Sequence, residues 1–362
     1  MSETINSIAP TNIAVVKYWG KNPEWERYHI PTKSSVSFTV DGLYTETELI
    51  MESGSGNVQF NLNDKEISPE MKEFEYVGDL LKKMFELVPE TKKYNYIVKS
   101  KNNFPTAAGY ASSASGFAAF AKALQGAMKK LEPKVYEDYM SSDKKLSVFA
   151  RLGSGSATRS IPAKGGFVVW KRGINPKNCP KQSETDDETK KKIIFSSYSK
   201  TLFKPEYWPE FRIVYAKVQE KEKKIKSRAG MKTSVENCPV YWDWVKYEEK
   251  VSMPGIIESV KNKDFPAFAK LAMECSNGLH AVMLYTYPKI AYLNDTSQEI
   301  MDRIIAMNEK EAKAAYTYDA GPNAIVFTTA QHESETVSLL KEIVGNDNVT
   351  VTKMGKGPRL VR

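Results

Sequence analysis

The sequence predicts a protein of mixed helices and strands, divided into two domains. The chain has 362 residues, more than a single hydrophobic core usually organises. Both halves contain short apolar runs typical of strands, and longer stretches with apolar residues at helical spacing. A polar, proline-containing region lies between the halves, so we expect domains at residues 1–195 and 196–362.

In the first half, strands are expected before helices. We expect, in chain order, strands at residues 13–18, 36–43, 45–51 and 57–62, a helix at 70–87, a strand at 95–100, helices from 112 and at 144–151, and a strand at 166–170. The helix from residue 112 is predicted by Ala114, Phe117 and Ala121, which recur at helical spacing. Serines at its start can cap it.

The second half shows the same mixture after a surface loop or insertion at residues 173–190. We expect, in chain order, a strand at 211–218, helices at 240–260, 265–283 and 292–307, a strand at 324–328, a helix at 336–344 and a strand at 350–353. The last strand can return to either sheet.

Composition narrows the class of protein. Hydrophobic residues make up 41% of the chain, as in ordinary globular proteins. The residues contain no transmembrane run and no signal-peptide pattern, so we expect a cytoplasmic protein without a membrane partner. The three cysteines, Cys179, Cys238 and Cys275, form no metal-ligand pattern, and reduced thiols are expected. The net charge of +8 is spread out, which favours small anions over nucleic acid.

Several polar segments have the composition of anion sites. Lys17 and Lys21 follow an apolar run of strand type, where compact cations can hold an anion. The small-residue loop at 105–115 leads into a helix, and helix starts bind phosphates, although small residues also allow tight packing. The segments 151–160 and 227–234 combine serines with Arg159 and Arg228, although ordinary loops and helix caps have similar composition.

Asp319 is the candidate catalytic carboxylate. It lies in a turn between two strand-like runs, in an apolar neighbourhood where Lys17 could pair with it and keep it ionised. Such a group can act as a general base or an electrostatic anchor, although an isolated aspartate there is more often a turn former. His280 is expected in the core or behind the site, and the sequence contains no pattern for a metal site.

Taken in order, these motifs resemble the mevalonate diphosphate decarboxylases of the GHMP kinase superfamily. The motifs are Asn12-Ile13-Ala14-x-x-Lys17-Tyr18-Trp19-Gly20-Lys21, Pro105-Thr106-Ala107-Ala108-Gly109, Ala111-Ser112-Ser113-Ala114-Ser115, Gly153-Ser154-Gly155-Ser156-Ala157, Arg228-x-Gly230-Met231 and Asp319-Ala320-Gly321-Pro322-Asn323. The resemblance covers most of the chain and includes the archaeal phosphomevalonate and mevalonate 3,5-bisphosphate decarboxylases. It implies an α+β, GHMP-kinase-like two-domain fold with an active-site cleft between the domains.

The resemblance also implies roles for individual residues. The catalytic residues would be Asp319, Lys17 and Arg159, with Arg159 holding the substrate carboxylate. The residues that bind the phosphorylated mevalonate would be Asn12, Tyr18, Lys21, Ser154, Ser156, Arg228 and Met231. The nucleotide phosphates would lie against Gly109, Ser112, Ser113, Ser115 and Ser227. The product would be isopentenyl diphosphate or isopentenyl phosphate, and the resemblance allows a homodimer.

Some departures from the family pattern leave the use of ATP open. Tyr110 stands where a leucine is usual, and Lys33 stands where an asparagine is usual. The segment 174–208 is longer and more basic than in compact bacterial members. The main expectation is an ATP-dependent diphosphomevalonate decarboxylase with Mg-ATP as co-substrate. The alternative is a mevalonate 3,5-bisphosphate decarboxylase, which needs no ATP because its substrate already carries the 3-phosphate. A small-molecule kinase, a nucleic-acid-binding module and a non-catalytic relative are more distant alternatives.

Overall fold

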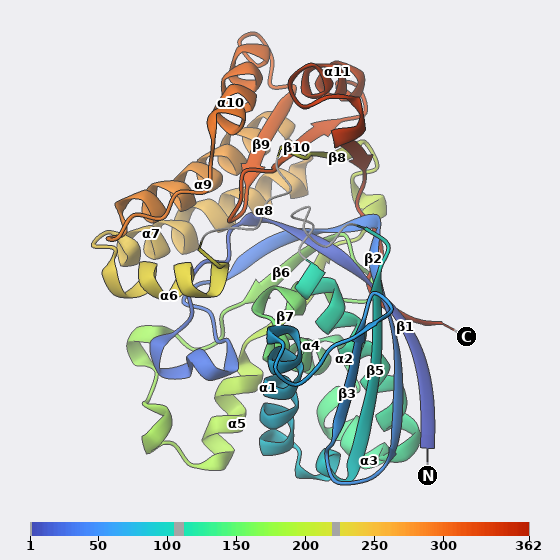
Figure 1. Cartoon of the computed structure of the whole chain (residues 1–362). Helices are drawn as coiled ribbons and strands as arrows, with labels where there is room; N and C mark the ends of the chain where they lie inside the picture. The colour runs from blue at the N-terminus through green and yellow to red at the C-terminus, as the bar shows by residue number, and fades with distance from the viewer. Residues whose placement is uncertain (1, 105–111, 219–224, 362) are drawn as a thin grey trace.

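The protein, seen in a computed structural model, consists of two sheets, each with its own helices (Figure 1). The structure describes residues 2–104, 112–218 and 225–361. Within these residues, no helix combines the length and the apolar character that crossing a bilayer requires. Cys179, Cys238 and Cys275 are all free.

The first sheet contains eight strands among the described residues, in the order β12-β1-β2-β5-β3-β4, with β6 paired to β2 and β7 paired to β6. The strands are β1 (Ser2–Val16), β2 (Ser35–Ser53), β3 (Val58–Leu62), β4 (Lys65–Glu66), β5 (Tyr94–Asn102), β6 (Phe167–Lys171), β7 (Tyr198–Phe203) and β12 (Arg359–Val361). The pair β3–β5 is parallel and the other pairs are antiparallel.

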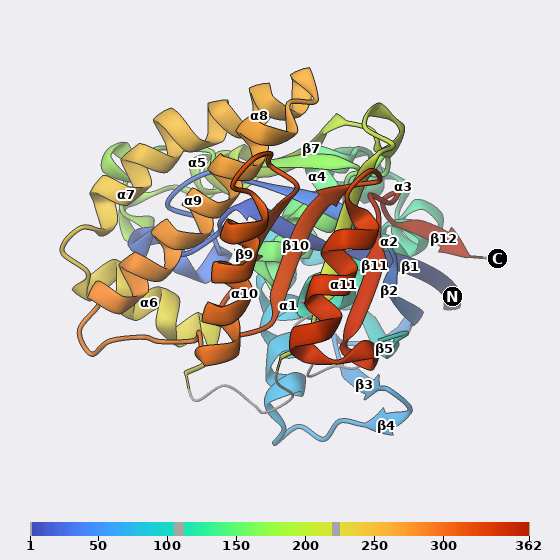
Figure 2. The same ribbon diagram turned by 90° about the horizontal axis from the view of Figure 1, so that it is seen from above.

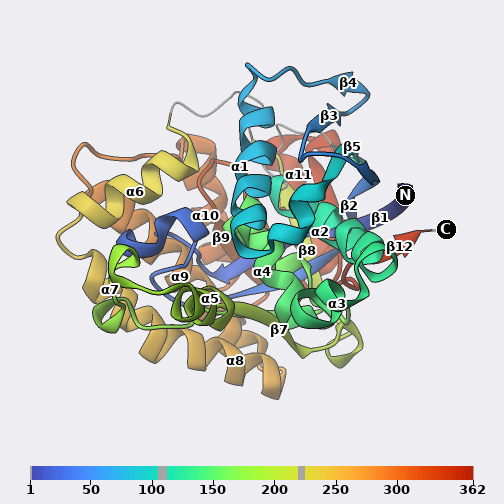
Figure 3. The same ribbon diagram turned by 90° about the horizontal axis from the view of Figure 1, so that it is seen from below.

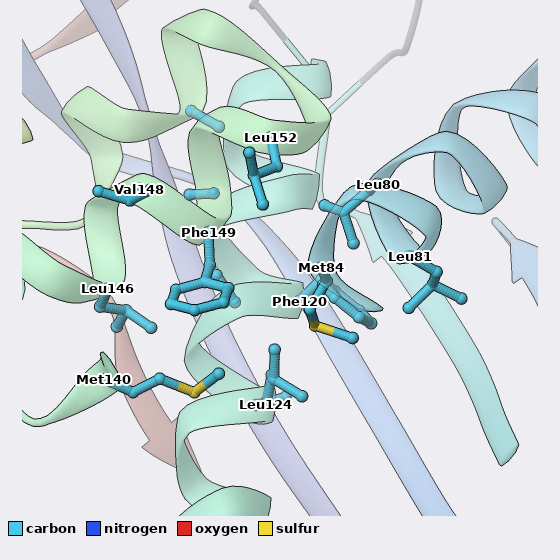
Figure 4. Close-up of a cluster of buried hydrophobic side chains, with 14 of the residues drawn as sticks. Leu80, Leu81, Met84, Phe120, Leu124, Met140, Leu146, Val148, Phe149 and Leu152 are labelled. Atoms are coloured by element: carbon cyan, nitrogen blue, oxygen red, sulfur yellow. The ribbon is translucent and has the colours of Figure 1, made fainter. Parts of the chain in front are cut away.

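Helices cover one face of this sheet and form the larger core. They are α1 (Lys72–Leu87), α2 (Ser112–Leu131), α3 (Pro133–Val135), α4 (Asp143–Gly153) and α5 (Asp187–Ser196), with short helical turns η1 (Pro23–Tyr28), η2 (Pro89–Lys93), η3 (Tyr136–Met140), η4 (Gly155–Ser160), η5 (Pro176–Asn178) and η6 (Gln182–Glu184). Figure 4 shows Met84, Phe120, Leu124 and Phe149 from three of these helices packed together. Burying side chains of this size stabilises the domain by about 1.5–3 kcal/mol each.

The second sheet has the order β11-β8-β10-β9 and is antiparallel throughout. Its elements are η7 (Pro205–Tyr207), β8 (Phe211–Ala216), α6 (Ser227–Asn237), α7 (Tyr241–Tyr247), η8 (Glu248–Ser252), α8 (Met253–Asn262), α9 (Phe265–Tyr285), α10 (Asp295–Met307), β9 (Ala314–Tyr318), β10 (Ala324–Thr329), α11 (Glu333–Val344), η9 (Asn346–Asn348) and β11 (Val349–Thr352). Figure 2 shows α10 and α11 side by side over these strands.

The two domains share an aromatic core. Phe38 of β2 lies 4.4 Å from Phe211 of β8, measured between ring centroids, and 5.7 Å from Phe268 of α9. All three rings are fully or almost fully buried. Helix α9 also contacts β1, so it lies where the domains meet. This shared core fixes the end of β1 against the second domain.

The chain crosses between the domains twice. It leaves the first sheet after β7, enters the second at β8, and returns after β11 so that β12 pairs with β1. Figures 1 and 3 show the two chain ends on the same side of the molecule. At the return, the Gly166 N–H donates to the Gly355 carbonyl at 2.9 Å, and Gly166 has a φ of 71°. A side chain there would collide with the backbone at Phe203.

The structure corrects several predicted elements. β1 begins at Ser2 rather than at residue 13, and the strands expected at 36–43 and 45–51 are one strand, β2, with an irregular register around Gly42. The strands β4, β7 and β12 and the helix α5 were not predicted. The domain boundary after residue 195 stays a prediction; β7 still belongs to the first sheet and β8 opens the second.

Candidate active site

The end of β1 brings a buried lysine to the aspartate of the second domain. Lys17 is 1% exposed, and its Nζ donates to the Ala14 carbonyl at 2.9 Å and to Asp319 Oδ1 at 2.8 Å. Asp319 lies in the turn between β9 and β10, and its side chain is 43% exposed. The carboxylate is therefore held by a buried cation and still open on one side.

His280 of α9 lies behind this pair, as the sequence suggested. Its ring is 7% exposed, and its Nε2 is buried without a hydrogen-bond partner among the described residues. Burial lowers the pKa of His280 to about 4, and the Lys17 ammonium acts in the same direction. Asp319 only partly opposes them, so the imidazole is neutral near pH 7.

Arg159 reaches the same region from η4. Its Nε donates to Asn12 Oδ1 at 3.0 Å, and its Nη1 donates to Ser35 Oγ at 3.1 Å. Asn12 in turn donates to Ser160 Oγ at 2.8 Å. These contacts leave Nη2 without an acceptor among the described residues. Burial lowers the pKa of Arg159 to about 10, partly offset by Asp319, so the guanidinium stays charged.

Tyr18 lies against the turn that carries the two predicted serines. A Cβ at Gly155 would lie 2.6 Å from the Tyr18 hydroxyl, so only glycine fits beneath this ring. The hydroxyl oxygen is buried without a hydrogen-bond partner among the described residues, and burial raises its pKa. Such an orphaned polar atom indicates a place that a ligand completes.

Ser156 of η4 and Ser154, the residue before η4, lie close to the start of α2. Ser154 Oγ lies 3.2 Å from Ser156 Oγ and 3.4 Å from Ser113 Oγ. Three hydroxyls from two elements thus converge at one position. Hydroxyls can donate to phosphate oxygens, so this group suits an anionic ligand.

Arg228, Lys21 and Met231 line a small hollow together with Glu26. The Arg228 Nη2 donates to the Gly153 carbonyl at 2.8 Å, and its guanidinium lies 3.8 Å from the ring centroid of Tyr76. Burial lowers the pKa of Lys21, while Glu26 at 3.4 Å partly offsets the effect. The sequence-predicted cations therefore meet at one end of the site.

Only the end of the predicted phosphate loop, from Ser112, belongs to the described residues. Gly109 lies outside the described residues. Ser112 is the first residue of α2, and Ser113 is exposed beside it, so both lie at the helix start where backbone N–H groups are unpaired. Ser227 is the first residue of α6. Ser115 points elsewhere: it is fully buried, and its hydroxyl lies 2.6 Å from Thr45 Oγ1.

Sequence reasoning missed a buried lysine near the hollow. Lys83 of α1 is 2% exposed, and its Nζ donates to Asp79 at 2.6 Å and to the Leu152 carbonyl at 3.3 Å. Lys83 lies on the buried apolar face of α1 with Leu80, Met84 and Leu87. A charged residue on such a face could have been recognised in the sequence as a candidate for burial. Lys83 adds positive charge behind Gly153.

Buried groups around η1 were also missed. Arg151 is fully buried and donates to the carbonyls of Tyr28 and Ile194, and burial lowers its pKa to about 9. His29 Nδ1 lies 2.8 Å from the Arg151 carbonyl oxygen. Trp25 Nε1 donates to the Pro180 carbonyl at 2.9 Å. The segment 174–208, whose role the sequence left open, thus supports the loop that carries Glu26.

No set of three or more His, Cys, Asp or Glu side chains within the described ranges could hold a metal ion. Mg²⁺ bound to a nucleotide needs no such set, because phosphate oxygens and water supply most of its ligands. One exposed carboxylate, Asp319, and the hydroxyls of Ser113 and Ser154 have the oxygen chemistry that such an ion prefers.

Comparisons with known proteins agree along the chain. Residues 9–181 match the diphosphomevalonate decarboxylase-like N-terminal domain, and residues 213–361 match the mevalonate 5-diphosphate decarboxylase C-terminal domain. The diphosphomevalonate decarboxylase of Ganoderma lucidum is 36% identical over 350 residues, which cover 92% of this chain and 80% of that protein.

Solved structures show the same fold over the full length. Mevalonate diphosphate decarboxylase from Staphylococcus aureus has a TM-score of 0.84 at 28% identity and covers 100% of this chain and 99% of its own. A complex of MDDEF with MVAPP, AMPPCP and magnesium has a TM-score of 0.82 at 29% identity and covers 100% of both chains.

Proposed function

The chain belongs to the mevalonate diphosphate decarboxylase family, and on this premise we propose that it is an ATP-dependent diphosphomevalonate decarboxylase. The reaction phosphorylates the tertiary 3-hydroxyl of the substrate, releases that phosphate and loses carbon dioxide to form isopentenyl diphosphate. The observation that carries the proposal is the contact between Lys17 and Asp319, with Arg159 reaching the same region.

The chemistry needs a carboxylate at this position. Transfer of a phosphoryl group requires the 3-hydroxyl to lose its proton, and a carboxylate within hydrogen-bond reach can take it. When the 3-phosphate leaves, positive charge develops at C3, and a fixed anion stabilises that charge. Lys17 holds Asp319 at 2.8 Å and limits its rotation, so both roles use one fixed group.

Arg159 supports the elimination step by holding the substrate carboxylate. Asn12 and Ser35 fix two of its nitrogens, so the guanidinium has one orientation. A bidentate contact from arginine aligns a carboxylate in a plane, which allows the carbon–carbon bond to lie anti to the departing phosphate. In this proposal Asn12 acts by orienting Arg159.

The cationic hollow and the serine hydroxyls would bind the diphosphate tail. Lys21 and Arg228 supply charge, Ser154 and Ser156 supply hydroxyl donors, and the unpartnered Tyr18 hydroxyl gains a phosphate oxygen as acceptor. Met231 closes the apolar side of the hollow. Since this end does not react, its contacts contribute to binding more than to the chemical step.

Mg-ATP is proposed as co-substrate, with its phosphates at the start of α2 near Ser112 and Ser113. MDDEF has been solved with AMPPCP and magnesium, which supports this assignment. Curated relatives at this level of similarity include fungal and animal diphosphomevalonate decarboxylases. A cytoplasmic location and a homodimer stay predictions from the sequence.

The test is carbon dioxide release from diphosphomevalonate, 5-phosphomevalonate and mevalonate 3,5-bisphosphate, each with and without Mg-ATP. We expect turnover of diphosphomevalonate that requires Mg-ATP. Turnover of the bisphosphate alone, indifferent to ATP, would replace the proposal with the ATP-independent decarboxylase. ADP formation without carbon dioxide would identify a small-molecule kinase instead.

A further inference from the structure

A second lysine makes a cross-domain ion pair close to the first one. Lys33 lies in the segment between η1 and β2, and its Nζ is 3.2 Å from Glu248 Oε2 at the start of η8. The two side chains are 1% and 2% exposed. Charges this well buried lose their hydration, so an ion pair of this kind is a weak source of stability and calls for another explanation.

Lys33 also touches the residue that carries the candidate catalytic ammonium. Its Nζ donates a hydrogen bond to the main-chain carbonyl of Lys17. The third neighbour of the ammonium is the ring of Trp244, whose centroid lies 4.6 Å away. The ammonium is thus surrounded by a carbonyl, a carboxylate and an aromatic face, which leaves no side for a substrate.

Residue 17 is therefore held at both ends. Lys33 binds its carbonyl, while Ala14 and Asp319 bind its side-chain nitrogen. Both partner carboxylates, Asp319 and Glu248, belong to the second domain, and both lysines belong to the first. The two ion pairs consequently depend on the same relative placement of the domains.

The neighbouring contacts strengthen this placement. The Ser34 N–H donates to Glu249 Oε1, and Arg172 Nη1 lies 3.8 Å from the same oxygen. The main-chain N–H of Arg172 also donates to Ser34 Oγ at 3.2 Å. Two consecutive glutamates of η8 therefore anchor two consecutive residues of the first domain, directly beside the end of β1.

We propose that Lys33 is a positioning residue: through the Lys17 carbonyl and the Glu248 carboxylate it fixes the main chain from which the Lys17 ammonium reaches Asp319. Lys33 does not contact the substrate, because it is buried on all sides. A buried ammonium needs an acidic partner, and Glu248 supplies it for Lys33. The kinetic test of this inference rests on the proposed function, whereas the structural test does not.

The test compares three variants. Two are the single substitutions Lys33→Met and Lys33→Arg, and the third combines Lys33→Met and Glu248→Gln in one chain. Methionine keeps the length of the side chain and removes the donor, so we expect kcat to fall about 100-fold, the usual cost of misplacing a reacting group. The KM for the phosphorylated mevalonate should change less than about 3-fold, because substrate contacts are untouched. Arginine keeps a donor and a cation and should recover kcat to within about 10-fold of the wild type.

The double variant separates positioning from simple charge burial. It removes both buried charges, so thermal stability should return towards that of the wild type while kcat stays low. Full recovery of kcat in the double variant would overturn the proposal. Leu340→Ala, a core variant in α11, controls for loss of stability, and its kcat should match the wild type well below its Tm.

A crystal structure of Lys33→Met gives a readout that does not depend on turnover. We expect Lys17 Nζ and Asp319 Oδ1 to lie beyond hydrogen-bond distance in it. An unchanged 2.8 Å contact together with wild-type kcat would refute the positioning role. A wild-type enzyme without decarboxylase activity would instead refute the proposed function and leave the structural test standing. If Lys33→Met does not fold, Lys33→Arg and the double variant carry the same comparison.

Discussion

Lys17 Nζ lies 2.8 Å from Asp319 Oδ1, although 302 positions separate the two residues in the chain. The lysine is buried in the first domain and the aspartate is partly exposed on the second. The contact can form only when both domains are folded and docked. In the proposed mechanism, catalytic competence therefore requires the two domains to be docked.

Replacing Asp319 by asparagine should reduce kcat at least about 1,000-fold, because the amide neither accepts the proton nor stabilises positive charge at C3. The KM should change little, since the diphosphate contacts remain. Steady-state carbon dioxide release measures both constants. Asp347→Asn, an exposed aspartate in η9, is the matched control. Turnover of Asp319→Asn close to that of the wild type would remove Asp319 from the mechanism.

Arg228→Ala should raise the KM for the phosphorylated mevalonate about 10- to 100-fold and leave kcat within about 3-fold. The side chain would hold a phosphate that does not react, so its loss weakens ground state and transition state alike. Arg303→Ala removes an exposed arginine paired with Glu342 and should change neither constant. An unaltered KM in Arg228→Ala would place this residue outside the binding site.

Tyr18→Phe tests the unpartnered hydroxyl. Removing a buried hydroxyl without a hydrogen bond costs the free protein nothing, so the Tm should stay the same or rise. The KM should nevertheless rise about 10-fold, because a hydrogen bond to phosphate is lost. Thermal unfolding with and without substrate separates the two effects. A lower Tm combined with an unchanged KM would show that the hydroxyl serves the fold alone.

His280 should make the protein less stable in mild acid. Its folded pKa of about 4 lies below the ordinary value of 6.5, so the unfolded chain binds the proton more readily. Stability is complete above pH 6.5 and decreases as the pH falls towards 4. The histidine alone should lower the free energy of unfolding by about 2 kcal/mol between about pH 7 and pH 5.

Urea unfolding at the two pH values measures this change, and His280→Gln should show a smaller pH dependence by about that amount. His332, whose Nε2 lies 3.5 Å from Glu311 Oε1, is the histidine used for comparison. If His280→Gln and the wild type lose equal stability, the imidazole titrates normally in the folded protein.

Much of the site could be predicted because its residues stand in short, distinctive segments. Lys17 follows the apolar run of β1, and Asp319 occupies a turn between two apolar strands, so each local pattern marked its residue. The pairing of the two followed from charge and desolvation. The three hydroxyls of Ser113, Ser154 and Ser156 were likewise marked by their small neighbours.

The rest depends on contacts between distant segments, which local patterns do not contain. Glu248 lies 215 positions from Lys33 and stands among other charged residues, so nothing nearby indicated that it would be buried. β12 has three residues and no alternating pattern, and pairing with β1 alone makes it a strand. The position of Lys83 on an apolar helix face was visible in the sequence. Its burial was not, because the ammonium of such a lysine usually reaches water.

The return of the chain to β1 limits how the protein can move. Two connections join the second domain to the first, one after β7 and one after β11. Two connections and the aromatic core between them leave the domains one relative placement, and that placement brings Lys17 to Asp319.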